Sequence, residues 1–197
     1  MQITVKADVK KLTRNLSRIQ RRQIPYATQT ALNNTAKKLV VAEQKQMQRK
    51  LHNPTPQTVK ALRILRYAKK TQLSALVGFL PFASEYMQYQ VHGGIEPIQK
   101  ANPVPSSNMR LNKYGNIPGK RKGLAHQKKR FIATTRAGKT AVWERRGKDA
   151  KPIIWLNKKD PSYKKRFPFY RIANGLVSNV FPKEFTKTLR RALATAR

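Results

Sequence analysis

Apolar side chains recur at helical spacing in the first fifty residues. Behind Asp8, a residue type that caps helix N-termini, apolar positions three or four residues apart predict a helix over 8–19. Ile24-Pro25 marks a break, and a stripe of mostly small residues then predicts a second helix that ends before the prolines of "HNPTP". The two stripes are Val9, Leu12, Leu16 and Ile19, and Ala27, Ala31, Thr35, Leu39 and Ala42. We expect the narrow second stripe to pack closely against another element.

The middle of the chain changes to the period of two that strands show. Leu73, Ala75, Val77 and Phe79 alternate with polar or small neighbours, which predicts a hairpin within 58–80 that turns at 69–72. A second hairpin is predicted over 131–146, and "KPIIWLN" (151–157) predicts a further strand. Between the two hairpins, "FASEYMQYQVHGG" predicts a short aromatic helix that ends at its glycines. The two tryptophans of the chain fall in these strands and are expected to be core or sheet-face residues.

The second predicted hairpin contains the tripeptide Gly138-Lys139-Thr140, with which a phosphate-binding P-loop ends. Such a loop needs a further glycine five residues earlier, where this chain has Ala133, and it must lead into a helix. The residues that follow are β-branched and aromatic and favour a strand. We therefore interpret the tripeptide as a hairpin turn in which Gly138 supplies a positive φ.

The chain closes with a helix from Tyr170 and, after Phe181-Pro182, with another that carries Phe185, Leu189 and Leu193. This order predicts an α+β fold with N-terminal helices, an antiparallel sheet of about four to five strands and a C-terminal helix. The length of 197 residues favours a single domain over 1–197. The sequence has no apolar run of membrane-spanning length and begins without the apolar stretch of a signal peptide, so we expect no membrane span and synthesis in the cytoplasm.

Charge is the most unusual property of the sequence. Forty-three Lys and Arg stand against eight Asp and Glu, a formal net charge of +35. Charges this dense repel one another unless an anionic partner lies close, and counterion release then drives binding to a phosphate backbone. No helix-turn-helix, zinc-finger or RNP-type pattern indicates base reading. The composition therefore favours contact with nucleic acid that is independent of sequence.

The basic residues cluster in and after a long segment rich in proline and glycine. Residues 95–130 contain nine Lys and Arg and a single acid, Glu96. A loop of this length inside a compact domain is usually functional or disordered, and composition allows either. The predicted DNA-binding residues are Lys120, Arg121, Lys122, Lys128, Lys129, Arg130, Arg145, Arg146 and Lys148.

Catalytic chemistry finds little support in the residues. There is no cysteine, and the three histidines share no metal-ligand spacing. Asp149-Ala150-Lys151 resembles half of a metal-dependent nuclease site, but only Glu144 is near enough in sequence to supply the second carboxylate. Three basic residues separate the two acids, so the acids are better explained as moderating local charge repulsion. We expect no enzyme activity, no catalytic residues, no metal and no cofactor.

Three stretches of the chain resemble phage proteins. "LTRNLSRIQRRQIPYATQTALNNTAKKL" and "FPKEFTKTLRRAL" are similar to the opening and closing helices of the phage minor tail protein Z family, the tail-completion proteins. "EYMQYQVHGG" is similar to the aromatic segment in the wider tail-completion fold of long-tailed phages. Together these stretches cover about a quarter of the chain, mainly at its ends, and residues 95–130 lie outside the resemblance.

The resemblance implies a virion protein of the tail and neck, assembled in the host cytoplasm. Such proteins form a ring where the tail meets the head, next to the end of the packaged genome. It implies a homohexamer whose partners are the tail terminator or tail tube, the head–tail connector and DNA, without contact to a membrane. We expect Ala27, Ala31, Tyr86 and Tyr89 to contact neighbouring subunits or the tail terminator. The alternative, from charge alone, is a free nucleic-acid-binding protein of ribosomal or nucleoid type.

Overall fold

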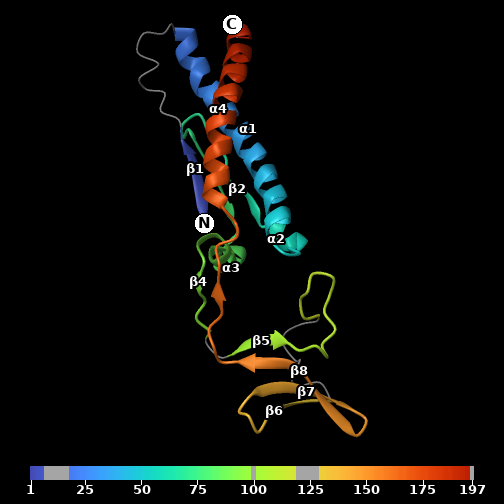
Figure 1. Cartoon of the computed structure of the whole chain (residues 1–197). Coiled ribbons are helices and arrows are strands. Elements are labelled where there is room, and N and C mark those ends of the chain that lie inside the picture. The colour runs from blue at the N-terminus through green and yellow to red at the C-terminus, as the bar shows by residue number, and fades with distance from the viewer. Residues whose placement is uncertain (7–17, 99–100, 119–128, 196–197) are drawn as a thin grey trace. The chain divides into compact units, whose positions relative to one another are not determined.

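The computed structural model describes residues 1–6, 18–98, 101–118 and 129–195 (Figure 1). Contacts divide the chain into two compact units, one formed by Met1–Val91 with Lys165–Arg197 and the other by His92–Lys164. Helices combine with antiparallel sheets, which confirms the predicted α+β class. The predicted single sheet of about four to five strands is corrected, because the described residues form nine strands in three sheets. The single domain over 1–197 stays a prediction, and each unit is described by itself.

The first unit, unit 1, combines a small sheet with helices. Its three strands are antiparallel in the order β1-β3-β2, so that β3 is central. β3 is buried along almost its whole length, whereas β1 alternates buried Ile3 and Val5 with exposed neighbours, as expected for an edge strand with one covered face. The elements of this unit are β1 (Gln2–Lys6), α1 (Arg18–Lys50), α2 (Pro56–Lys60), β2 (Leu62–Arg66), β3 (Ser74–Phe79), α3 (Pro81–His92) and α4 (Phe169–Ala194).

The core of unit 1 lies where the helices meet the sheet. Leu32, Leu39 and Met47 of α1 are fully buried in it, and Phe169 at the start of α4 packs its ring 5.6 Å from that of Phe79 on β3. α1 and α4 run side by side and antiparallel (Figure 1). The tight partner expected for the small-residue stripe of the second predicted helix is therefore the C-terminal helix of the same chain.

Two predicted helix breaks are wrong. Pro25 lies inside α1 and Pro182 inside α4, each of which is one helix rather than two. A proline in a helix interior removes one hydrogen bond, but packing of the residues on both sides can offset that loss. In α4 the stacked rings of Phe181 and Phe185, with centroids 6.0 Å apart, flank the proline. Most of the predicted helix 8–19 lies outside the described residues.

The sequence analysis missed β1. The strand pairs with β3, and Ile3 lies opposite Val77. Gly78 of β3 is required there, because a Cβ at this position would lie 2.5 Å from the carbonyl oxygen of Met1. A five-residue alternation gives a weak signal by itself, and the partner that confirms it is more than seventy residues away.

Other predicted elements of unit 1 are confirmed. β2 and β3 form the expected hairpin, with a bridge between Lys69 and Gln72 at its turn. α3 ends at His92, before the two glycines, and α1 ends at Lys50. After α1, Thr55 caps α2 by accepting a hydrogen bond from the backbone N–H of Thr58, with proline at the first helical position.

The second unit, unit 2, is built from strands. Its four-stranded antiparallel sheet has the order β5-β8-β7-β6, and β4 pairs with β9 in a separate ribbon. The hairpin over 131–146 and the strand at 151–157 are both confirmed. Gly138, in the turn of that hairpin, has the expected positive φ, at +76°. The strands are β4 (Gly94–Ile95), β5 (Asn102–Pro105), β6 (Arg130–Thr134), β7 (Thr140–Arg146), β8 (Asp149–Asn157) and β9 (Ser162–Tyr163).

A long loop was predicted over 95–130, but this segment is not a loop throughout. It contains β5, and it begins in β4 and ends in β6. Pro103 and Pro105 obscured β5 in the sequence, since proline is unfavourable in a central strand. β5 is an edge strand of its sheet, where a missing N–H donor is tolerated.

Candidate nucleic-acid interface

The two faces of the unit 2 sheet differ in their side chains. Residues directly opposite on paired strands share a face, so the register assigns every strand position to one side. One side, here named the packed face, carries Arg130, Ile132, Val142, Glu144, Arg146, Ile154 and Leu156. The other side, here named the aromatic face, carries Val104, Phe131, Ala133, Ala141, Trp143, Arg145 and Trp155.

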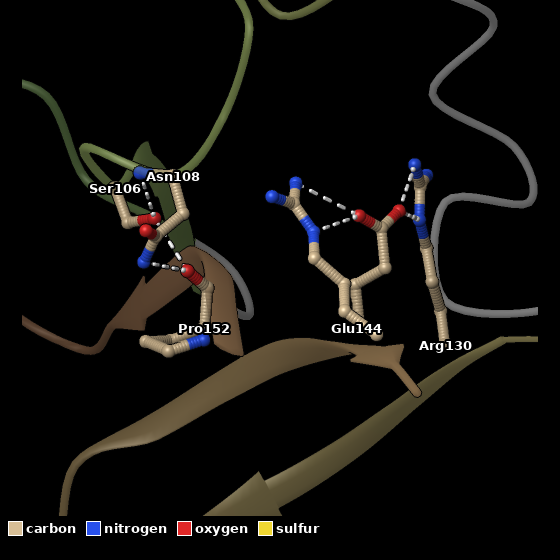
Figure 2. Close-up of polar contacts among 6 residues, drawn as sticks. Ser106, Asn108, Arg130, Glu144 and Pro152 are labelled. Atoms are coloured by element: carbon tan, nitrogen blue, oxygen red, sulfur yellow. Dashed lines mark hydrogen bonds and ion pairs between the residues drawn. The ribbon is translucent and has the colours of Figure 1, made fainter. Parts of the chain in front are cut away.

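Residues 106–118 cover the part of the packed face over β7 and β8, whereas Ile132 of β6 is 56% exposed. Met109 and Ile117 pack against a small core around Val142 and Ile154. β8 has a bulge at this point, which leaves the carbonyl of Pro152 outside the regular ladder. That carbonyl accepts hydrogen bonds from the hydroxyl of Ser106 and from the amide of Asn108, at 3.1 Å from the latter (Figure 2). The bulge thus anchors the turn that begins the covering segment.

A carboxylate between two guanidinium groups lies on the same face. Glu144 of β7 accepts hydrogen bonds from Arg130 of β6 at 2.9 and 3.0 Å and from Arg146 at 3.3 Å (Figure 2). The hydrogen bond from Arg130, followed by that from Arg146, holds the pKa of Glu144 below its ordinary 4.5. The carboxylate is therefore ionised at neutral pH and neutralises part of the local positive charge.

The predicted DNA-binding residue Arg130 is largely committed within the chain. Its side chain is 15% exposed and is tied to Glu144, whereas that of Arg146 is 53% exposed. Arg145 is exposed, and its guanidinium lies over the ring of Phe131 on the aromatic face, 5.4 Å from the ring centroid. Lys129 and Lys148 are exposed as well. Lys120, Arg121, Lys122 and Lys128 lie outside the described residues.

The sheet register brings two separate basic clusters of the sequence together. The backbone N–H of Arg145 donates to the carbonyl of Lys129, and the turn after Arg146 begins with Gly147 at a φ of +65°. The exposed cations at this end of the sheet, here named the basic end, are Lys129, Arg145, Arg146, Lys148 and Lys151. Lys151 was not among the predicted DNA-binding residues, because it stands outside any run of charges in the sequence. In the sheet it lies opposite Glu144.

Four acidic residues have partners among the described residues, so few carboxylates are left to compensate the exposed cations. Besides Glu144, Glu184 pairs with Lys38 at 2.6 Å. Glu96 accepts a hydrogen bond from the Tyr163 hydroxyl, and Asp160 accepts one from the backbone N–H of Ile98. Since the sequence has only eight acidic residues for forty-three basic ones, the surface is strongly positive whatever the pairing.

The residues expected at subunit contacts differ in their surroundings. Ala27 and Ala31 are fully buried, and the carbonyl of Ala27 accepts a hydrogen bond from Thr188 of α4. Their side chains are thus covered by the chain itself, which corrects the expectation that they contact a neighbouring subunit. Tyr86 of α3 is 37% exposed and donates its hydroxyl to Thr58, and Tyr89 is half-buried.

Metal-binding clusters and membrane-spanning helices are absent from the described residues. These residues contain no group of three or more His, Asp and Glu side chains that could hold a metal ion. Asp149 lies opposite Arg146 in the ladder, and Glu144 is occupied by its two arginines. Among the described helices, none is both long and apolar enough to cross a bilayer.

Comparison with protein-family models, with curated proteins and with solved structures found no match to this chain.

Proposed function

We propose that this protein is a bacteriophage structural protein that completes the tail and joins it to the head, and that unit 2 contacts the genome end there without reading its sequence. The role is passive, with no catalytic step. The similarity of residues 12–39, 85–94 and 181–193 to tail-completion proteins supports the location, and the charge of +35 supports the nucleic-acid contact.

The basic end is the observation that carries the proposal. Five exposed cations meet at one end of the sheet: Arg145 and Arg146 from β7, Lys151 from β8, Lys129 just before β6 and Lys148 in the turn between β7 and β8. The nearby Glu144 is engaged by Arg130 and Arg146. Lysine and arginine side chains of this kind reach phosphate oxygens, which position a protein on nucleic acid but carry no sequence information. A contact that must accept any genome end needs this kind of surface.

A ring of identical subunits fits the same chemistry. We propose a homohexamer in the particle, with the tail terminator or tail tube and the head–tail connector as partners. Mutual repulsion of subunits at +35 opposes ring closure in isolation, and DNA in the channel would compensate that charge. The exposed side chains Phe82 and Tyr86 of α3 are apolar surface of a kind that protein partners cover.

Mass spectrometry of purified phage particles tests the location. We expect peptides of this protein in particles that are free of host contaminants, in an amount matching a ring rather than a major tail subunit. Absence of the protein from the particle, together with tight binding of the isolated protein to duplex DNA, would support the alternative of a free nucleic-acid-binding protein.

A further inference from the structure

The aromatic face of the unit 2 sheet places three large rings on adjacent strands. Phe131 of β6 lies directly opposite Trp143 of β7. Trp155 of β8 lies opposite Ala141, two residues from Trp143 on the same face. The rings therefore form a diagonal row across three strands, and all three residues are half-buried rather than enclosed.

Local contacts hold these rings along the sheet. The indole N–H of Trp143 donates to the carbonyl of Ala133 on the neighbouring strand at 3.1 Å, which lays the ring across β6. The small residues Ala133 and Ala141 occupy the neighbouring positions on this face, directly opposite each other. Arg145 places its guanidinium over the Phe131 ring at the edge of the row.

This arrangement is separate from the hydrophobic core of unit 2. That core lies on the packed face, where residues 106–118 cover Val142 and Ile154. The acidic residues Glu144 and Asp149 lie on the packed face, together with Arg130, Arg146 and Lys151. On the described strands β6, β7 and β8, the charged residue on the aromatic face is Arg145. The aromatic row is thus bordered by Arg145 of the basic end and has no carboxylate within its own surface.

We propose that the aromatic face stacks unpaired bases of single-stranded nucleic acid while the basic end holds its phosphates. This inference rests on the proposed nucleic-acid contact and adds the substrate form. Rings on a cationic surface bind single strands without sequence preference, because every base has a π face and only unpaired bases expose it. An acidic protein partner would also satisfy the cations, but the half-buried row of rings beside Arg145 favours a ligand that offers flat bases as well as phosphates.

Tryptophan fluorescence tests the proposal directly, because Trp143 and Trp155 are the two tryptophans of the chain and both lie on this face. The full-length protein is titrated with oligothymidine, with a duplex of the same length and with heparin, which is a polyanion without bases. We expect strong quenching by oligothymidine and little change with heparin, although both bind. Equal quenching by the two, or binding of oligothymidine without quenching, would overturn the inference.

Variants separate stacking from charge. Trp155→Leu should weaken oligothymidine binding roughly 5- to 100-fold and leave heparin binding unchanged, and Phe131→Leu provides a second test should the first variant fold poorly. Ile132→Ala, which alters an exposed apolar residue on the packed face, is the matched control and should change neither affinity. Equal losses for both ligands in the ring variants would contradict stacking. Failure of the wild-type protein to bind any of the three polyanions would instead refute the proposed nucleic-acid contact itself.

Discussion

Lys38 of α1 and Glu184 of α4, which are 146 residues apart in sequence, form an ion pair of 2.6 Å. Asn34, one turn earlier on α1, donates to the other oxygen of the same carboxylate at 3.1 Å. With the hydrogen bond from Thr188 to the carbonyl of Ala27, these contacts fix how α4 lies along α1. α1 and α4 are therefore joined by polar contacts as well as by packing.

Glu184→Gln removes the ion pair with Lys38 and should lower the free energy of unfolding at pH 7 by about 1 kcal/mol. The effect stays this small because Lys38 is largely exposed and its charge is screened by solvent. The hydrogen bond from Lys38 holds the pKa of Glu184 below its ordinary 4.5. The ionised carboxylate thus stabilises the fold above pH 4.5, and this contribution is lost as the pH falls through the lower folded pKa. Denaturant unfolding from pH 3 to 7 measures this loss of stability. Lys37→Gln, at an exposed neighbouring position, is the control. If Glu184→Gln loses as much stability as the wild type on acidification, the role of the pair is contradicted.

Glu43 should make the protein less stable at alkaline pH. This α1 residue is fully buried, neither carboxyl oxygen has a hydrogen-bond partner among the described residues, and burial raises its pKa to about 8. The folded state keeps a proton that the unfolded chain releases above pH 4.5, so stability is full below that pH and falls by a few kcal/mol as the pH rises to 8. Glu43→Gln should match the wild type at pH 4 and exceed its stability at pH 9, as read from thermal unfolding. Glu85→Gln, on the exposed side of α3, should follow the wild-type profile.

Two glycine substitutions should act in opposite directions. Gly78→Ala should destabilise the protein by about 1–3 kcal/mol, because the new methyl group would meet the Met1 carbonyl where β1 and β3 approach. Gly175→Ala lies in α4 with nothing within 4 Å of the added methyl group, and it should stabilise the protein by about 0.5–1 kcal/mol. Denaturant midpoints of the two variants measured side by side check both signs. If the two substitutions changed stability equally, the close approach of the Met1 carbonyl to Gly78 would be refuted.

Lys148→Gln and Arg130→Gln should separate a phosphate contact from a structural arginine. Lys148→Gln should reduce the slope of log K against log salt for duplex binding by about 1 and leave stability unchanged. Arg130→Gln should leave the slope nearly unchanged but lower stability by about 1–3 kcal/mol, because Glu144 loses its shorter pair of hydrogen bonds. Salt titrations monitored by fluorescence anisotropy decide between them, and a larger slope change for Arg130→Gln would reverse the assignment.

Replacement of Lys120, Arg121 and Lys122 by Gln should leave the fold intact and lower the infectivity of particles. These residues belong to the basic segment 95–130 and are part of the predicted DNA contact. Circular dichroism checks folding, and a plaque assay measures infectivity. Normal infectivity would count against a DNA-facing role for this cluster.

Local signals in the sequence were sufficient for much of the fold. The glycines after His92, the prolines after α1 and the β-branched alternation of the two hairpins predicted elements that the structure confirms. Signals that depend on distant partners were not sufficient. β1 is defined by its pairing with β3, and the continuity of α4 through Pro182 depends on side-chain packing that a local rule does not include.

The candidate site was predictable in part for the same reason. Runs of charge indicated Arg145, Arg146 and Lys148, whereas the role of Arg130 depends on its partner across the strand pair. The aromatic face was not predicted, since the placement of Phe131 beside Trp143 and Trp155 follows from register and from the bulge in β8. A one-residue change of register would have moved these side chains to the other face.

Electron cryomicroscopy of the neck in assembled phage particles would locate the protein and its unit 2 cations. We expect a ring of this protein between head and tail, with Lys129, Arg145 and Lys148 of unit 2 directed at DNA in the channel. A ring whose unit 2 cations face outward into bulk solvent, away from the channel, would contradict this expectation.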